Sequence, residues 1–266
     1  MRQTLRILSY ISRHIFVRPL YLFTYVKNYL NPGYIPDIKY YENIDIVSGL
    51  KAGKSLIRLG DGEIYIMNGG GIGYQKYNSK LKRLFFMMVE KYSNDTNYIL
   101  CLPRVMLEKT NFQLKNEKLL NCWLPFKVSF NLYFSKTSHY GDAFLFYYNE
   151  TIPSLLENYL LTKHLIYVTN QDNLDAIQGN SLIPFTDVSF VVTPKEDAFT
   201  DFDKIKEKIV NKVLQIGKKN CIILAACGPA SKAIAYDLSF EGIVTIDVGR
   251  GIEITYTEHS LKHLVH

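Results

Sequence analysis

The chain has 266 residues, of which 47% are hydrophobic, and its formal net charge is +6 at pH 7. This length is long for one domain and short for two, and the hydrophobic share is enough for a substantial core. The moderate positive charge permits an anionic partner, but no basic stripe within a known motif supports nucleic acid as that partner.

The cysteines and the N-terminus indicate the cellular compartment of the protein. The four cysteines are Cys101, Cys122, Cys221 and Cys227, and none forms a C-x-x-C pair. We expect buried free thiols in a reducing compartment rather than a zinc site. Residues 1–30 lack an A-x-A-like cleavage site, and the chain has no run of roughly 20 apolar residues, so we expect a cytoplasmic protein without a spanning helix.

The first 36 residues differ in character from the rest. A helical arrangement of residues 1–18 places Leu5, Leu8, Ile11 and Ile15 on one face and Arg2, Arg6 and Arg13 on the other. No Asp or Glu occurs before Asp37, and aromatic residues are frequent. Residues 1–30 are therefore interpreted either as an amphipathic segment on the inner face of the cell membrane or as a helix packed on the domain. The proline and glycine of residues 31–36 indicate a linker, so we expect segment 1–36 and a single domain over 37–266.

Helices and strands are predicted to alternate after the linker. In chain order we expect a helix at 38–52, a strand at 55–60, a helix at 79–92, a strand at 97–103, helical structure over 105–136 with a break or kink at Pro125, a helix late in 142–163, strands at 164–170 and 188–194, a helix at 201–217, a strand at 220–228, a helix at 229–242 and a strand at 243–249. Apolar strands alternating with helices predict an α/β fold. We expect a Rossmann-like, mostly parallel, doubly wound sheet with helices on both faces and an N-terminal amphipathic helix.

The stretch LIRLGDGEIYIMNGGGIG (56–73) places two acids, Asp61 and Glu63, directly after the first long strand. Such sheets bind ligands beyond the carboxyl ends of their strands. In an extended or turning segment both carboxylates can face one pocket, where a divalent cation, Mn²⁺ or Mg²⁺, relieves their repulsion and holds a diphosphate. The flanking Gly60 and Gly62 let a ligand approach closely. A plain surface turn is the alternative, because Asp-Gly is a common turn dipeptide.

Two neighbouring features are open to two interpretations each. Arg58, just upstream, is a candidate either to bind phosphate or to pair with one of the acids. The glycine-rich residues 69–73 lack the spacing of a dinucleotide fingerprint. They are interpreted either as a mobile loop over the pocket or as a plain connection.

A second group of candidates lies late in the chain. Gly228, Pro229 and Ser231 fall between a strand and a helix N-terminus, where free backbone N–H groups attract anions, although ordinary capping explains them equally. Asp247 and Arg250 follow the last strand at the same edge as Asp61. Arg250 is a candidate to bind the diphosphate or to neutralise the acids.

Two further sets of polar residues are weaker candidates. Glu253 and Asp247 are candidates for the catalytic base. Asn170, Gln171 and Asp172 are polar groups suited to a hydroxyl-rich ligand.

Three segments, in order, resemble the GT-D glycosyltransferase family, formerly a domain of unknown function. They are RLGDGE (58–63), IGYQKYNSKL (72–81) and LAACGPASKAIAYDL with IDVG (224–238 and 246–249), and the resemblance extends over about residues 40–256. It implies a nucleotide-sugar-dependent glycosyltransferase with a Rossmann-like fold, whose D-x-E acids, here Asp61 and Glu63, bind the metal and the nucleotide sugar. Arg250 stands where the family usually has a histidine, and a cationic side chain cannot ligate a metal.

These patterns lead to one functional hypothesis with two alternatives. We expect transfer of a sugar from a nucleoside-diphosphate sugar, a UDP-sugar by preference, to a glycan or polyprenyl-linked acceptor in surface polysaccharide or glycoprotein biosynthesis. The alternatives are a metal-dependent nucleotidyl or phosphoryl transferase and a non-catalytic membrane-associated module. The predicted catalytic residues are Asp61, Glu63 and Glu253, the first two also being metal ligands, and the predicted donor-binding residues are Arg58, Gly60, Gly62, Gly228, Pro229, Ser231, Asp247 and Arg250.

Overall fold

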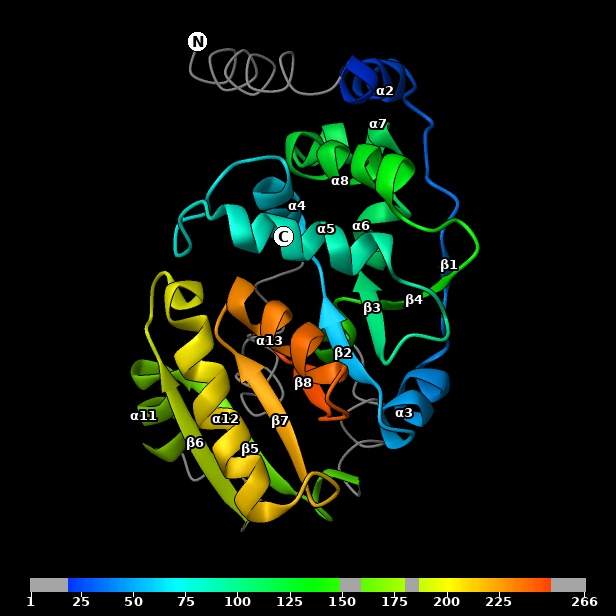
Figure 1. Ribbon diagram of the computed structural model, residues 1–266. Coiled ribbons are helices and arrows are strands. Elements are labelled where there is room, and N and C mark those ends of the chain that lie inside the picture. Colours follow the sequence, from blue (N-terminus) through cyan, green and yellow to red (C-terminus); the bar gives the residue numbers. More distant parts are fainter. Residues whose placement is uncertain (1–18, 149–158, 180–186, 250–266) are drawn as a thin grey trace.

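The structure is a computed structural model that describes residues 19–148, 159–179 and 187–249 (Figure 1). Within these ranges eight strands form one sheet in the order β1-β4-β3-β2-β8-β7-β5-β6, and every neighbouring pair is parallel. The predicted α/β class with a parallel, doubly wound sheet is therefore confirmed.

The strands are β1 (Lys39–Tyr40), β2 (Ser55–Arg58), β3 (Tyr98–Leu102), β4 (His139–Asp142), β5 (His164–Asn170), β6 (Val188–Thr193), β7 (Cys221–Ala226) and β8 (Thr245–Asp247). The helices are α2 (Pro19–Tyr29), α3 (Asn43–Lys51), α4 (Asp61–Met67), α5 (Ser79–Glu90), α6 (Arg104–Leu107), α7 (Asn111–Asn116), α8 (Leu120–Tyr133), α9 (Leu145–Tyr148), α11 (Gln171–Gly179), the 3-10 turn η1 (Ala198–Asp201), α12 (Phe202–Ile216) and α13 (Pro229–Ser239).

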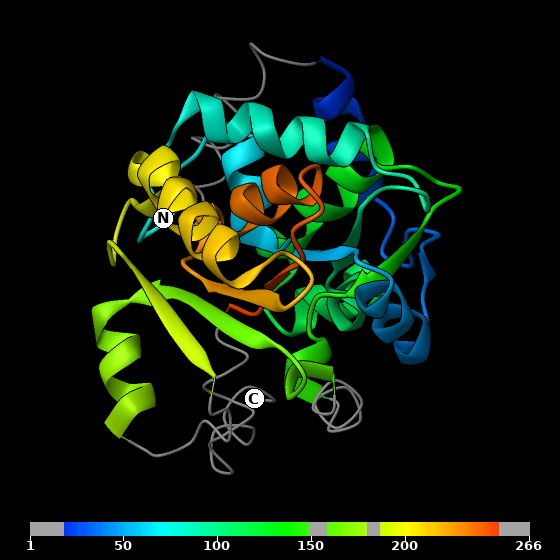
Figure 2. The same ribbon diagram turned by 60° about the horizontal axis from the view of Figure 1, so that its bottom comes forward.

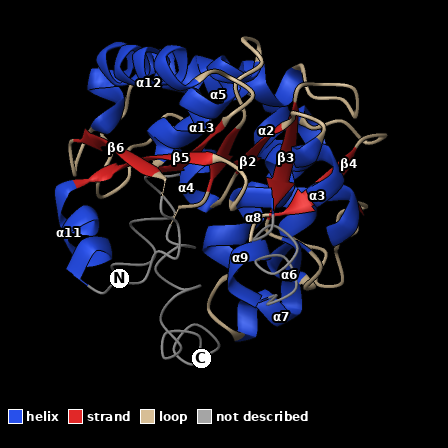
Figure 3. Cartoon of the chain, turned by 90° about the horizontal axis from the view of Figure 1, so that it is seen from below, coloured by secondary structure: helices blue, strands red, loops and turns tan. Residues whose placement is uncertain are grey.

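Both faces of the sheet are covered because successive residues of each strand point to opposite sides. One core contains Ile57, Leu100, Ile166 and Ile223 together with residues of α5, α8, α12 and α13. The other contains the residues just before them, Leu56, Ile99, Leu165 and Ile222, together with residues of α3. Figure 2 shows α5, α13 and α12 side by side on one face, and Figure 3 shows α12 and α11 on opposite sides of β6.

The centre of the sheet is the pair β2–β8, which joins an early strand to the last described one. From β2 the chain first adds β3 and β4 on one side, and β5, β6, β7 and β8 then fill the other side. Strand order therefore reverses at β2–β8. In open parallel sheets such a switch point leaves a crevice beyond the carboxyl ends of the strands, and ligands bind there.

Two short strands, β1 and β4, were not predicted. The helix expected over 38–52 starts only at Asn43, because Lys39–Tyr40 is β1. Strand β4 follows the helical stretch expected over 105–136. Two residues of β4 pair with β1 and two pair with β3. Strands this short carry no apolar run, so periodicity does not reveal them.

The helical stretch expected over 105–136 is three helices rather than one. The hydroxyl of Thr110 caps α7 by accepting a hydrogen bond from the N–H of Gln113 at 3.1 Å. Lys118 adopts a left-handed conformation with φ 59°, which separates α7 from α8. Pro125 lies inside α8, and the helix continues through it. Burial of Leu124 and Phe126 on either side stabilises α8 against the lost backbone hydrogen bond.

Helix α2 packs on α8 and joins the same body. Tyr21 is buried, and the side-chain amide of Asn111 donates to the carbonyls of Asn28 at 2.7 Å and Asn31 at 3.0 Å. None of the helices in the described ranges has the length and apolar character that a bilayer-spanning segment requires.

Gly141 in β4 is a position where the fold requires the absence of a side chain. A Cβ there would overlap the buried thiol of Cys101 in β3. We expect Gly141→Ala to lower the free energy of unfolding by about 1–3 kcal/mol, because a close-packed core cannot move aside. Chemical denaturation measures the change. Gly73→Ala is the control, since a Cβ at Gly73 meets nothing within 4 Å. Equal stability of the two variants would contradict the packing described for β3 and β4.

Candidate functional site

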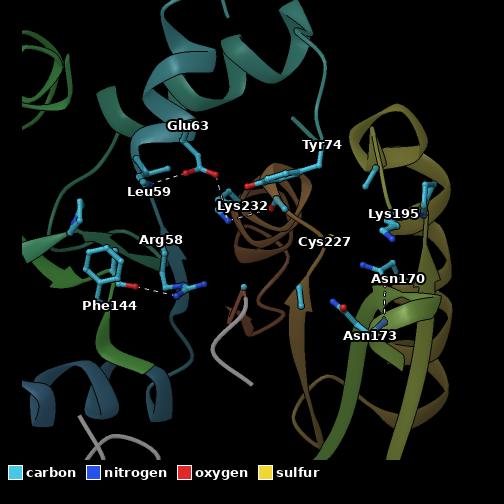
Figure 4. A pocket seen from close by; sticks show the side chains of 18 residues that line it. Arg58, Leu59, Glu63, Tyr74, Phe144, Asn170, Asn173, Lys195, Cys227 and Lys232 are labelled. Atoms are coloured by element: carbon cyan, nitrogen blue, oxygen red, sulfur yellow. Dashed lines mark hydrogen bonds and ion pairs between the residues drawn. The ribbon is translucent and has the colours of Figure 1, made fainter. Parts of the chain in front are cut away.

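A pocket of about 410 Å³ opens at the carboxyl ends of the strands (Figure 4). Seven strands contribute to its wall through the residues at or after their ends, which include Arg58 and Gly60 (β2), Pro103 (β3), Ala143 (β4), Asn170 (β5), Pro194 (β6), Cys227 (β7) and Gly249 (β8). Its volume lies within the range of roughly 300–1,000 Å³ that is usual for ligand sites. The pocket is therefore where the reversal of strand order predicts a ligand.

Four buried charged side chains alternate in sign along one wall of the pocket. The ammonium nitrogen of Lys232 lies 3.6 Å from Oε1 of Glu63 and 3.2 Å from Oδ2 of Asp247. The same Asp247 oxygen lies 3.7 Å from Nε of Arg58. Charges removed from water are costly unless each has a partner of opposite sign. The chain Glu63–Lys232–Asp247–Arg58, termed the charge chain here, meets that requirement.

Arg58 is fixed by several partners at once. Its Nε donates to the backbone carbonyl of Asp247 at 2.7 Å, and Nη1 donates to the carbonyl of Ala143 at 3.1 Å. Gly249 adopts φ 52°, and a Cβ there would overlap the guanidinium. Glycine at 249 thus supplies a backbone conformation that side chains avoid and leaves room for Arg58.

Lys232 projects from α13 one turn after its N-terminus. Its Nζ also donates to the carbonyl of Gly228 at 3.3 Å. Burial alone would lower the pKa of Lys232, but the charges of Asp247 and Glu63 outweigh burial and raise it. Lys232 therefore stays protonated at neutral pH and presents a positive charge to the pocket.

Glu63 occupies the third position of α4 and serves two neighbours. Its Oε2 accepts a hydrogen bond of 2.7 Å from the N–H of Gly60, which precedes the helix. Its Oε1 faces Lys232, and Figure 4 shows the two side chains pointing toward each other. One carboxylate thus closes the start of α4 and ends the charge chain.

Asp61 is placed differently from Glu63. The segment was expected to be extended or turning, and that expectation is wrong, because Asp61–Met67 is the helix α4. Residues two apart on a helix do not face the same way. Glu63 is buried and lines the pocket, whereas Asp61 is exposed and is not among the lining residues. Desolvation by nearby groups, followed by the charge of Glu63, raises the pKa of Asp61.

The described residues do not make up the ligand set of a divalent metal ion. In the described ranges no group of three or more His, Cys, Asp or Glu side chains converges as such an ion would need. Asp61 and Glu63 lie on different faces of α4, and both oxygens of Glu63 already face a donor or a cation. We therefore derive the binding of an anion from Arg58 and Lys232.

The other predicted site residues divide into three groups. Gly60 and Gly228 line the pocket with Arg58, while Asp247 lies fully buried behind it. Gly62, Pro229 and Ser231 are not among the lining residues. The hydroxyl of Ser231 accepts the N–H of Cys227 at 2.8 Å, so it stabilises the turn before α13. Arg250 and Glu253 lie outside the described residues.

The cysteines remain free, as expected, and three of the four are buried. Cys227 lines the pocket. Burial raises the pKa of its thiol to about 11, so at neutral pH it is protonated and unsuited to act as a nucleophile.

The loop that contains the glycine cluster reaches the pocket and is tied to its opposite wall. Tyr74 lines the pocket, and its backbone carbonyl accepts the N–H of Asp197 at 2.9 Å. The Oδ1 of Asp197 accepts the N–H of Lys76, and the side-chain oxygen of Gln75 accepts the N–H of Phe199 at 3.2 Å. These contacts join residues 74–76 of the loop to the turn after β6 and hold that part of the loop beside the pocket.

Sequence reasoning missed several lining residues. Lys232 is the most important, and its signal was present: it is the single cation in the otherwise small and apolar stretch 224–235. Tyr74 lies in a loop, and Asn173 and Lys195 lie three and two residues after the ends of β5 and β6. Asn170, which was considered, lines the pocket with Asn173 (Figure 4), whereas Gln171 bonds Asp175 and Asp172 pairs with Lys195.

A doubly wound parallel sheet with buried cations at the pocket of its carboxyl edge defines a class of α/β proteins suited to anionic, phosphate-bearing ligands. Within that class, the chain belongs to the GT-D glycosyltransferase family, because the family model described as "Glycosyltransferase GT-D fold" matches residues 56–262. This membership confirms the family resemblance seen in the sequence.

Curated relatives are similar over most of the chain. A probable glycosyl transferase, Gly, of Streptococcus gordonii is 23% identical over 209 residues, which are 75% of this chain and 30% of that protein. The glycosyltransferase GlyD of Streptococcus pneumoniae is 22% identical over 221 residues, 78% of this chain and 26% of that protein. The chain thus spans less than a third of the length of these two relatives.

Solved structures share the fold. A structure of domain of unknown function 1792, described as having a distinct glycosyltransferase fold, matches with a TM-score of 0.67 and 23% identity over 82% of this chain and 80% of that one. A glycosyltransferase of the same domain from Streptococcus sanguinis matches with a TM-score of 0.65 and 22% identity over 82% and 83%.

Lys232 offers a direct test of the charge chain. Lys232→Met keeps the length of the side chain but leaves Glu63 without its cation and Asp247 with Arg58 alone. We expect the free energy of unfolding to fall by about 3 kcal/mol. Lys206→Met is the matched control, since Lys206 pairs with Asp237 and Glu241 on a partly exposed surface, and it should cost less than about 1 kcal/mol. Denaturant unfolding of both variants gives the comparison, and equal losses would argue against a buried charge chain.

Asp61 offers a second test, in which removing the charge is expected to leave the stability unchanged or to raise it. Its pKa is raised in the folded state, so the folded protein still binds this proton at pH values where the unfolded chain has lost it. Stability contributed at Asp61 therefore falls as pH rises above the ordinary aspartate pKa. We expect Asp61→Asn to melt at an equal or higher temperature than the unaltered protein at pH 7, with the difference vanishing near about pH 3. A lower melting temperature for Asp61→Asn at pH 7 would contradict this environment.

Proposed function

We propose that the protein transfers a glycosyl group from a nucleoside-diphosphate sugar, and that the donor is a UDP-sugar. The observation that carries the proposal is the pair of buried cations, Arg58 and Lys232, at the pocket of a GT-D fold. A diphosphate carries several negative charges, and fixed cations in a site of low dielectric bind such a group strongly.

The charge chain suits the diphosphate because its cations are held in place before the ligand arrives. Arg58 is bonded to two backbone carbonyls, and Lys232 lies between two carboxylates. Gly228 lines the pocket at the start of α13, an 11-residue helix whose free N–H groups add a favourable partial charge. Neither cation has to give up a water shell during the reaction.

The chemistry follows from where charge develops. In the transfer, the bond between the anomeric carbon and the phosphate oxygen breaks, and its electron pair stays on the departing UDP. A hydroxyl oxygen of the acceptor bonds to the anomeric carbon, and its proton passes to a base, for which Glu253 stays the candidate proposed from the sequence. Arg58 and Lys232 stabilise the charge that grows on the leaving diphosphate, and preorganised charges of this kind commonly supply the largest share of catalysis.

The remaining walls of the pocket suit the neutral parts of the donor. Asn170 and Asn173 offer amide groups for sugar or base hydroxyl and carbonyl groups, and Tyr74 and Phe144 offer aromatic faces. Glu63 has lone pairs beyond its two present contacts and can accept a hydrogen bond from a donor hydroxyl. Of the predicted catalytic residues Asp61, Glu63 and Glu253, we therefore assign Glu63 to the pocket.

The metal ion and the acceptor are proposed from the sequence alone. A Mn²⁺ or Mg²⁺ ion on Asp61 and Glu63 remains the sequence-based prediction, and comparing turnover in Mn²⁺ with turnover in EDTA tests it. For the acceptor we propose a glycan, free or polyprenyl-linked, in surface polysaccharide or glycoprotein biosynthesis on the cytoplasmic side.

Release of UDP from a panel of nucleotide sugars, with and without Mn²⁺, tests the function. We expect one donor class to raise the melting temperature and to release UDP. Glu63→Gln should lower the rate at least about tenfold, because it weakens the hold on Lys232 and on the donor. Glu90→Gln, an exposed glutamate on α5, is the matched control and should keep full activity.

Two outcomes would overturn the proposal. One is the release of sugar 1-phosphate or of UMP in place of UDP, because transfer of UMP leaves sugar 1-phosphate and transfer of a sugar phosphate leaves UMP; either product would favour a nucleotidyl or phosphoryl transferase. The other is unchanged donor binding in both Glu63→Gln and Lys232→Met, which would mean that the donor does not enter this pocket.

A further inference from the structure

The outward side of helix α2 is an apolar surface. Leu20, Phe23 and Val26 of α2 are exposed, and so is Leu30, which follows the helix and continues its turn through a hydrogen bond to the carbonyl of Val26; Phe23 is 67% and Leu30 72% accessible. At about 100° per residue these four positions fall within one arc of roughly 120°. Large apolar side chains scattered singly are normal on a protein, but a row along one helix is a patch that marks an interaction site.

The opposite side of α2 is already used for packing. Tyr21 and Asn28 are buried against the body, and α2 contacts α8. The exposed row is therefore not the face that attaches the helix to the fold. Lys27 lies within the same arc and is exposed. A lysine there can place its stem along apolar surroundings and its ammonium in a polar layer.

Helix α7 lies beside the end of the segment that contains α2. The N–H of Phe112 donates to the carbonyl of Pro32 at 2.8 Å, so this exposed aromatic residue lies next to the end of the α2 segment. Lys115 and Lys118 are exposed nearby. The acids of this region are paired: Glu108 with Arg104 at 2.9 Å and Glu117 with Lys109 at 2.6 Å.

The charge of the adjoining sequence selects the partner. Residues 1–36 contain Arg2, Arg6, Arg13, Arg18 and Lys27 and no acidic residue. Two copies of such a segment repel each other, whereas anionic lipid headgroups attract it. We propose that the apolar row of α2 lies in the headgroup region of an anionic phospholipid bilayer. This proposal concerns location and does not depend on the sugar that the enzyme transfers.

The packing order gives this surface a consequence for the site. Helix α2 packs on α8, and α8 packs on α4, the helix that carries Glu63. Figure 1 shows α2 beyond α8 at the end of the molecule toward which β2 and β3 run. The membrane surface and the pocket are thus linked by two layers of packed helix, which hold the pocket at a fixed height above the lipid.

Vesicle flotation of the full chain tests the proposal. Vesicles of phosphatidylcholine with about 30% phosphatidylglycerol are compared with vesicles of phosphatidylcholine alone. We expect the protein to float with the anionic vesicles and to be released by high salt. Phe23→Glu with Leu30→Glu should lower the partition coefficient at least about tenfold, since two apolar anchors are lost and two anions are gained.

The matched control carries the same two charges elsewhere. Ile44→Glu with Leu214→Glu changes residues on α3 and α12 that are 57% and 68% exposed, and it should float as the unaltered protein does. Cooperative thermal melting checks that each variant is folded. If the Phe23 and Leu30 glutamates disturb folding, Phe23→Ser with Leu30→Ser replaces them, with the same expected direction.

Three results would overturn the proposal. The first is failure of the unaltered protein to float with anionic vesicles. The second is equal flotation of the α2 variant and its control. The third is an α2-dependent dimer in solution that does not bind vesicles, which would make a second copy of the chain the partner of this surface. None of these results bears on UDP release measured with a soluble acceptor, so failure here is distinguishable from failure of the proposed transferase function.

Discussion

The fold and the site both depend on one buried carboxylate, Asp247. It is fully inaccessible to water, and it is neutralised from two sides by Lys232 and Arg58. Those partners come from α13 and β2, while Asp247 ends β8, so two ion pairs to one carboxylate join three elements at the switch point of the sheet. The same pairing that satisfies Asp247 fixes the two cations at the pocket. Stability and ligand binding therefore share residues, and neither can be changed without the other.

The sequence reveals the architecture because the central strands contain continuous apolar runs. Residues 164–170 and 220–228 could hardly be anything but buried strands, and alternation with helices then dictates a parallel sheet. The rule that ligands bind beyond the carboxyl ends selected Arg58, Gly60, Glu63 and Gly228, and these do line one pocket. The parallel sheet and these lining residues could therefore be predicted from the sequence.

The rest depended on contacts that no local pattern records. Whether Asp61 and Glu63 converge is decided by whether the chain after β2 extends or coils, and a strand followed by Gly-Asp-Gly is compatible with either. The hydrogen bond from the N–H of Gly60 to the carboxylate of Glu63 stabilises the helical alternative. Lys232 was missed because its role comes from Asp247, 15 residues later, and not from its neighbours in sequence. Strands as short as β1 and β4 exist only through their pairing partners.

The pairing of β2 with β8 has a consequence for how the molecule is made. Arg58 and Asp247 are 189 positions apart, yet they are adjacent in the centre of the sheet. The chain is synthesised from its N-terminus, so the edge of β2 that pairs with β8 stays unpaired while almost two hundred further residues are added. Contacts of such long range slow folding, and the vacant edge of β2 is a place where a chaperone or a wrong strand can bind in the meantime. The pocket is accordingly completed last, when β8 pairs with β2.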